Sequence, residues 1–210
     1  MRSIYKIVVC SLLTLSITSC EKDLLEKEQY QKEIYLIGAY NRVWTTEVSY
    51  SNEEVKTYFT VSSSGTLALD RDVNVKMKIN EELVDIYNKK YWTVLNEDKY
   101  YKSLDTDLYS IPSLENTVIK HAEGISAEVP VLIKTASLKI DQSYVIPVEI
   151  ESTTGYPISE SGYKMLILLK LKNGYSGSYQ MSGHTTLEGE TPKTIQKPKT
   201  IKPTGVNTVR

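Results

Sequence analysis

Residues 73–80 read VNVKMKIN, and their alternation decides the fold class. Val73, Val75, Met77 and Ile79 occupy every second position, with asparagine and lysine between them. Because successive side chains of a strand point to opposite faces, this spacing predicts a strand with one apolar and one polar face. We therefore expect a sheet that buries one face of this strand in a core and exposes the other.

Other segments on both sides of this stretch show strand patterns as well. Residues 144–150 alternate in the same way, and Pro147 predicts an edge strand or a bulge there. Shorter alternations cover residues 59–61 and 129–133, while residues 165–169 are continuously apolar, as in a strand covered on both faces. Such short strands with one brief helix over about 140 residues predict an all-β, immunoglobulin-like β-sandwich.

One helix interrupts these strands. Asn80 can cap its first turn, and Leu83, Val84, Tyr87 and Tyr91 recur at helical spacing on one face. We expect this helix to pack across an open end of the sheets. Its two tyrosines are predicted to belong to the core rather than to a ligand site, because they lie on the apolar face.

The first residues carry the pattern of a secretion signal. The apolar run 7–15 follows two basic residues and is too short to span a bilayer, which takes about 20 apolar residues. Residues 17–19, Ile-Thr-Ser, then precede Cys20, and this arrangement resembles a bacterial lipobox. Residues 1–19 are therefore predicted to be a lipoprotein signal peptide and Cys20 to be lipidated. An ordinary signal peptide that contains a cysteine is the alternative.

The residues after this cysteine suggest a location. Residues 21–23, Glu-Lys-Asp, resemble the surface-export signal of Bacteroidetes lipoproteins. The resemblance implies a protein anchored in the outer membrane through lipid on Cys20 and exposed at the cell surface. Residues 20–32 are predicted to be the lipidated N-terminus and a tether. With Cys10 removed and Cys20 acylated, stability must come from a hydrophobic core rather than from a disulfide.

Charge and motifs exclude several classes of function. Removal of residues 1–19 changes the formal net charge from −1 to −3, which gives no electrostatic reason to expect nucleic acid as a partner. The two histidines lie in segments without a nucleophile elbow, so no catalytic residue is predicted. Asp70, Asp72 and Asn74 imitate part of a calcium loop but overlap the predicted strand. We therefore expect no enzyme, no metal and no cofactor.

Aromatic residues are the remaining candidates for recognition. The chain has 16 tyrosines and 2 tryptophans but a single phenylalanine. An aromatic face can bind the axial C–H groups of a pyranose while nearby hydroxyls fix its orientation. A purely structural role is the alternative, because β-proteins use many tyrosines in packing. The candidate glycan-contacting residues are Tyr40, Trp44, Trp92, Tyr100 and Tyr101.

The composition changes near the end of the predicted sandwich. Residues 33–172 hold the predicted strands and helix, and residues 175–184 predict a further strand. The chain from Glu190 is rich in proline, threonine and lysine. Two interpretations of residues 173–210 compete: a flexible basic tail, or the truncated start of a second β-rich domain. The second is favoured.

Three stretches resemble a known family: residues 73–91, residues 109–112 (YSIP) and residues 144–159 (YVIPVEIESTTGYPIS). They are similar to the immunoglobulin-like N-terminal domain of unknown function (DUF1735 type) of Bacteroidetes surface lipoproteins. The same domain also precedes the barrel of some family-18 endo-β-N-acetylglucosaminidases. The resemblance implies an outer-membrane lipoprotein encoded with polysaccharide-uptake machinery, usually with a second β-rich domain. It supplies no catalytic residue, and only Cys20 takes a defined role from it.

These observations predict a non-catalytic surface lipoprotein whose sandwich is a glycan-binding or spacer module beside an outer-membrane glycan importer. One alternative is a structural or adhesin-type module that contacts other proteins through sheet edges or loops. Another is the accessory domain of an enzyme whose catalytic part is absent from this chain. An exposed coplanar aromatic pair would favour glycan binding, whereas burial of nearly all tryptophan and tyrosine would favour a spacer.

Overall fold

The computed structural model describes residues 27–186, 188–189 and 191–210. The predicted signal peptide and Cys20 lie outside the described residues, so both stay predictions. Across the described ranges, no helix combines the length and apolar character needed to cross a bilayer.

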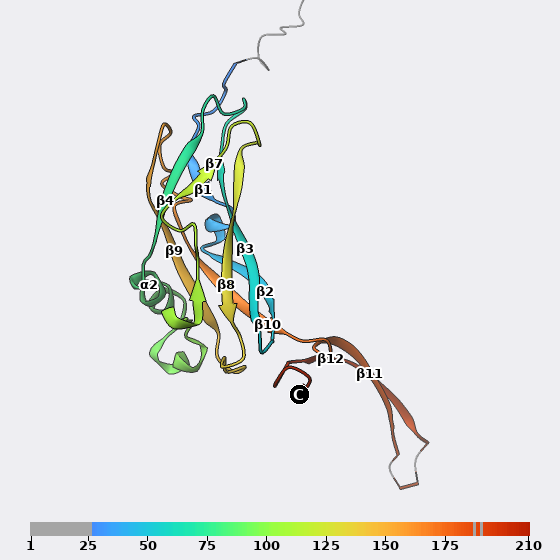
Figure 1. The fold of residues 1–210 in the computed structure, drawn as a ribbon. Coiled ribbons are helices and arrows are strands. Elements are labelled where there is room, and N and C mark those ends of the chain that lie inside the picture. Colours follow the sequence, from blue (N-terminus) through green and yellow to red (C-terminus); the bar gives the residue numbers. More distant parts are fainter. Residues whose placement is uncertain (1–26, 187, 190) are drawn as a thin grey trace, which may run out of the picture.

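Two β-sheets face each other and enclose a core (Figure 1). Only the β10–β2 and β5–β9 pairs are parallel, and the other described pairs are antiparallel. This arrangement confirms the predicted all-β sandwich. The first sheet has the order β1 (Ile34–Leu36), β3 (Glu54–Ser63), β8 (Ser126–Lys134) and β6 (Tyr109–Ser110). The second has the order β2 (Val43–Ser49), β10 (Lys164–Lys172), β9 (Tyr144–Thr153), β4 (Val73–Ile79) and β7 (Thr117–Ile119), with β5 (Lys102–Ser103) beside β9.

The core between the sheets follows from the alternation of the strands. Val73, Val75 and Met77 of β4 are buried, while the residues between them are exposed, as predicted. Phe59 and Val61 of β3 enter the same core from the first sheet. A strand with this alternation stabilises the fold only in one register, because a slip by one residue would turn its apolar side chains outward.

Strand β10 is covered on both faces, which confirms the prediction for residues 165–169. Met165, Ile167 and Leu169 belong to the core between the sheets. Leu166 is buried in a second, smaller apolar cluster on the outer face of the same sheet, and Leu168 packs against that cluster. A strand buried on both sides needs a continuous apolar run, and this is the pattern of its sequence.

Helix α2 (Glu82–Tyr91) forms the other half of this smaller cluster. Its buried Leu83 and Val84 pack with Val145 of β9 and Leu166 of β10. Figure 1 shows α2 beside the second sheet. The prediction that the helix packs across an open end of the sheets is therefore wrong. The physical reason is that β9 and β10 carry apolar residues on their outer face, and the apolar stripe of α2 covers them.

The junction between β4 and α2 explains the proline in β9. The side chain of Asn80 accepts a hydrogen bond from the N–H of Glu82 at 3.2 Å, as expected for a residue that caps the helix. Its N–H donates to the carbonyl of Pro147 at 3.1 Å, and its carbonyl accepts from the N–H of Leu83 at 3.2 Å. Proline has no N–H to donate to the Asn80 carbonyl, but this carbonyl already accepts from Leu83, so Pro147 leaves it paired. Since β9 lies inside the sheet and its bulge lies elsewhere, the predicted edge or bulge at Pro147 is wrong.

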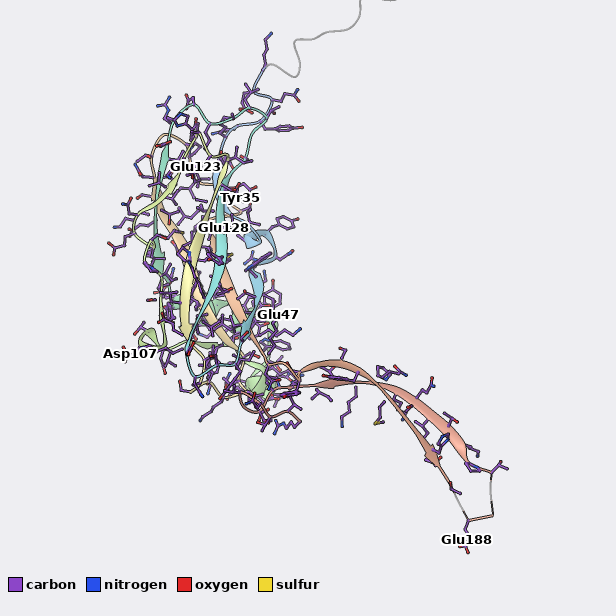
Figure 2. The ribbon with its side chains drawn as sticks, turned by 45° about the vertical axis from the view of Figure 1, so that its right-hand side comes forward. Tyr35, Glu47, Asp107, Glu123, Glu128 and Glu188 are labelled. Atoms are coloured by element: carbon purple, nitrogen blue, oxygen red, sulfur yellow. The ribbon has the colours of Figure 1, made fainter. Side chains whose placement is uncertain are left out.

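Strands β11 (Gly177–Thr185) and β12 (Lys193–Ile201) form a separate two-stranded antiparallel sheet. We call it the ribbon; it projects away from the sandwich in Figure 1, and Figure 2 shows Glu188 at its far tip. Every residue of β11 is exposed. The strand predicted over residues 175–184 is confirmed, whereas the boundary at residue 173 stays a prediction.

Candidate functional site

A surface groove of about 410 Å³ lies between the short 3-10 helix η1 (Ala39–Asn41), α2 and the start of β10. Four tyrosines contribute to its walls: Tyr40 from η1, Tyr87 and Tyr91 from α2, and Tyr163 just before β10. Tyr40 is 87% exposed and Tyr91 is 47% exposed. We call this surface the tyrosine groove. Its open walls present aromatic faces to solvent.

Charged side chains complete the tyrosine groove. Lys90 lies with its Nζ 5.4 Å from the centre of the Tyr91 ring, and Lys164 lies with its Nζ 4.8 Å from that of Tyr163. Such contacts between a cation and an aromatic face are attractive. The groove therefore combines apolar planes with charged groups that can form hydrogen bonds. Its charged lining residues are Arg42, Lys90, Lys164 and Glu160.

The tyrosines of α2 belong to a row of aromatic rings. The Tyr87 ring lies 4.4 Å from that of Tyr91 at an angle of 34°, and 5.2 Å from that of Tyr101 at 11°. Tilted and stacked rings at these distances attract each other. Partial burial and, as a smaller cause, the neighbouring Tyr101 raise the pKa of Tyr87 to about 12, so its hydroxyl stays protonated at neutral pH. Tyr87 and Tyr91 of this row line the groove, and Tyr101 stacks on Tyr87.

Asn88, buried in α2, holds this row together. Its Nδ2 donates to the carbonyl of Tyr101 at 2.9 Å, and its Oδ1 accepts from the N–H of Tyr101 at 2.9 Å. The two bonds tie the segment after α2, including the 3-10 helix η2 (Val94–Lys99), to the helix. This role of Asn88 was not predicted from the sequence. The pattern that indicates it is a polar residue, next to Tyr87, on the otherwise apolar stripe of the helix.

Asn88→Ala is expected to lower the free energy of unfolding by about 2 kcal/mol, because it leaves two backbone groups of Tyr101 without their partner. Urea denaturation measures this loss. Lys89→Ala, at the neighbouring exposed position of the same helix, is the matched control and should change the value by less than about 0.5 kcal/mol. Equal losses in both variants would contradict the role assigned to Asn88.

The structure brings few of the predicted aromatic residues together. Tyr40 lines the tyrosine groove, and Tyr101 supports its wall through Tyr87. Trp92, Tyr100 and Trp44 do not line it. Their proposed contacts with glycan stay predictions.

The surroundings of the two tryptophans suggest structural roles. Trp44 of β2 lies so close to Gly38 that a Cβ at this glycine would be 2.5 Å from its ring. Trp92 follows α2 and is half-buried, and Lys99 lies with its Nζ 5.6 Å from its ring centre. The indole Nε1 of Trp92 is buried, with no hydrogen-bond partner among the described residues.

Two tyrosines of the groove differ from the sequence prediction. Tyr91 was expected in the core, but this prediction is wrong, because α2 buries only its first turns and Tyr91 is its last residue. Tyr163 was not predicted as a site residue. It lies just before an apolar strand, and nothing in its local sequence indicates that it would meet η1 and α2. Tertiary packing alone places it in the groove.

The acidic residues that imitate a calcium loop have other partners. Asp70 binds the Arg71 guanidinium and the Tyr156 hydroxyl, and these bonds hold the pKa of its carboxyl far below the usual range. Asp72 accepts from the His121 N–H at 3.0 Å and contacts its ring Nδ1 at 2.7 Å, which lowers the pKa of Asp72. The described part of the chain contains no cluster of three or more histidine, cysteine or acidic residues arranged for a metal ion.

The two-sheet architecture defines an all-β sandwich protein. A family model described as an N-terminal domain matches residues 30–157, which is more than half of the chain, and the corresponding C-terminal model matches residues 163–210. The chain belongs to this family, and it is of the DUF1735 type, as the sequence resemblance predicted.

Chains of known structure share the fold, and 18 of them match. A Bacteroides ovatus protein of unknown function has a TM-score of 0.65 and 19% identity, over 86% of this chain and 61% of its own. A Bacteroides ovatus multidomain protein including DUF1735 has a TM-score of 0.57 and 21% identity, over 80% of this chain and 55% of its own. A proposed carbohydrate-binding protein from Bacteroides ovatus has a TM-score of 0.52 and 16% identity, over 75% of this chain and 43% of its own.

These similarities concern the fold. The chain spans between 43% and 61% of the length of the three structures, so it corresponds to part of each. One of these proteins is described as having unknown function, one by its DUF1735 domain and one as carbohydrate-binding. A search of the curated proteins finds no match.

Proposed function

We propose that the protein is a non-catalytic glycan-binding module, anchored in the outer membrane through lipid on Cys20 and placed beside an outer-membrane glycan importer. The tyrosine groove is the observation that carries this proposal. Tyr40 and Tyr91 expose aromatic rings on its walls, and charged side chains lie next to them. An aromatic plane with adjacent hydrogen-bonding groups matches a pyranose, which has an apolar C–H face and hydroxyls around its rim.

The size of the groove agrees with this ligand class. A volume of about 410 Å³ falls within the range of small-molecule sites, roughly 300–1,000 Å³. The structural similarity to a proposed carbohydrate-binding protein supports the same class of ligand. A pure spacer, by contrast, has no need to expose tyrosine rings around a concave surface.

The direction of the chain supports the proposed anchoring. In Figure 1, the chain from residue 27 enters the sandwich at one end, and α2 lies toward the other end. A tether from Cys20 would therefore hold the entry end near the membrane. The tyrosine groove lies along the outer face of the second sheet, beside α2 and the start of β10, where an extracellular glycan could reach it from the side.

Tyr91→Ala is expected to weaken glycan binding about 10-fold, the effect of roughly 1.4 kcal/mol of lost stacking. The measurement is retardation of the full chain in native gels that contain single polysaccharides, followed by titration with the one that retards it. Tyr58→Ala is the matched control, because Tyr58 is 44% exposed but lies on β3 in the other sheet. If no polysaccharide retards the wild-type chain, glycan binding is refuted.

The ribbon favours a second candidate function, contact with another protein. Its two strands pair only with each other in the described structure, so each has an outer edge free for a further strand. Tyr179 and Met181 are exposed on the same face, opposite Lys199 and Lys197. Tyr179→Lys and Met181→Lys together should then abolish capture of a partner, as measured by cross-linking on intact cells. The same double variant should leave retardation by glycan in native gels unchanged.

A further inference from the structure

The tyrosine groove carries an excess of positive charge. Its walls hold three cationic side chains, Arg42, Lys90 and Lys164, but one acidic side chain, Glu160. Among the described residues, no ion pair joins any of the three cations to a carboxylate. Other lysines of β4 and β10, by contrast, pair with glutamates of neighbouring strands. The unpaired cations of the groove are therefore available to a ligand.

Arg42 has an unusual backbone for a residue with a side chain. Its φ of 64° is the only positive value among the described residues other than glycine. Its N–H donates to the carbonyl of Ala39 at 2.8 Å, and its carbonyl accepts from the N–H of Leu166 at 2.8 Å. Glycine adopts this conformation without steric cost, so an arginine here is disfavoured locally. Strain of this kind concentrates at functional sites, and Arg42 lines the groove.

The two lysines place their charge beside apolar planes. The ammonium groups of Lys90 and Lys164 each lie over the ring of a groove tyrosine, Tyr91 and Tyr163. A ligand that fills the groove thus meets aromatic carbon and positive charge together. Guanidinium and ammonium groups form their strongest hydrogen bonds with ionised acceptors, such as the oxygens of a carboxylate or the terminal oxygens of a sulfate.

We propose that the tyrosine groove binds an anionic sugar residue, with its ring against the tyrosines and its carboxylate or sulfate between Arg42, Lys90 and Lys164. This inference rests on the proposed glycan-binding function and names its ligand class. The carboxylate of Glu160 forms no ion pair among the described residues and can accept hydrogen bonds from sugar hydroxyls.

Calorimetric titration of the detergent-solubilised full chain tests this inference. The probes are oligosaccharides from polygalacturonate, alginate and hyaluronan, each beside its carboxyl-reduced neutral form, and a chondroitin sulfate fragment beside its desulfated form. We expect at least one anionic form to bind about 10-fold more tightly than its neutral partner, with a preference that shrinks at high salt. Equal affinities within every pair would overturn the inference and leave glycan binding standing. Binding to none of the probes, together with no gel retardation, would overturn both.

The triple variant Arg42→Gln, Lys90→Gln, Lys164→Gln assigns the preference to the groove. It should bind the anionic and neutral forms with equal affinity, while its affinity for the neutral form stays as in the wild type. The control is Lys56→Gln, Lys139→Gln, Lys197→Gln, which removes the same charge at exposed positions outside the groove. A control variant that loses the preference equally would overturn the assignment to the groove.

Arg42→Gly separates the functional role of Arg42 from a structural one. Because glycine relieves the left-handed backbone, this variant should unfold at the same or a higher temperature than the wild type. Its affinity for the anionic form should nevertheless fall several-fold. A higher unfolding temperature with unchanged anionic preference would exclude Arg42 from the proposed site.

Discussion

Phe59→Ala is expected to lower the free energy of unfolding by about 3–5 kcal/mol, the usual cost of removing a buried aromatic ring. Phe59 is 2% exposed and belongs to the core between the two sheets. Its removal takes away the apolar area that the ring buries and leaves a cavity that the surrounding strands fill only in part. Small domains are stable by roughly 5–15 kcal/mol, so this one change removes a large share of the total.

The neighbouring residue is the matched control for this experiment. Tyr58 precedes Phe59 on β3 but points to the other face, where it is 44% exposed and Lys56 lies with its Nζ 5.0 Å from its ring centre. Tyr58→Ala should therefore cost less than about 1 kcal/mol, measured with Phe59→Ala by urea denaturation followed through tryptophan fluorescence. Similar costs would mean that β3 does not bury the face assigned to it, since a shift by one residue exchanges the two faces.

The sandwich could be predicted because its strands carry their periodicity locally. The alternation of residues 73–79 and the continuous apolar run of residues 165–169 each depend on which faces of one strand are covered. Strand β2 lacked such a signal. It forms an outer strand of its sheet, in a parallel pair with β10, and buries only Val48. A strand with so little buried surface has no need of a strict alternation.

The tyrosine groove could be predicted only in part for a related reason. Tyr40 was a candidate because an aromatic face can bind a pyranose, but its neighbours in the groove come from α2 and from the start of β10. The sequence indicates a helix with an apolar stripe and does not indicate which face of which sheet the stripe covers. The position of α2 on the outer face of β9 and β10 exposes Tyr91 and creates the groove.

Cys20→Ala is expected to release the protein from the membrane completely and to abolish its labelling with palmitate. The expectation follows from the lipobox pattern of residues 17–20, in which the cysteine thiol is the acylated group. Acyl chains contribute about 0.8 kcal/mol per buried methylene, so their loss removes the anchor rather than weakening it. Cys10→Ala is the matched control, because Cys10 lies in the predicted signal peptide and its variant should label and fractionate as the wild type does.

Retained labelling of Cys20→Ala would refute the lipobox assignment, and loss of labelling in Cys10→Ala would show that the assay does not report on a single acylation site. The Cys20→Ala variant also separates membrane location from glycan recognition. Purified Cys20→Ala should still bind glycan in gels, because the tyrosine groove lies within the described sandwich, whereas cells that express it should lose surface capture of the same glycan. If the purified variant also lost binding, the groove would depend on the anchor, and the proposed division between a tether and a recognition domain would be wrong.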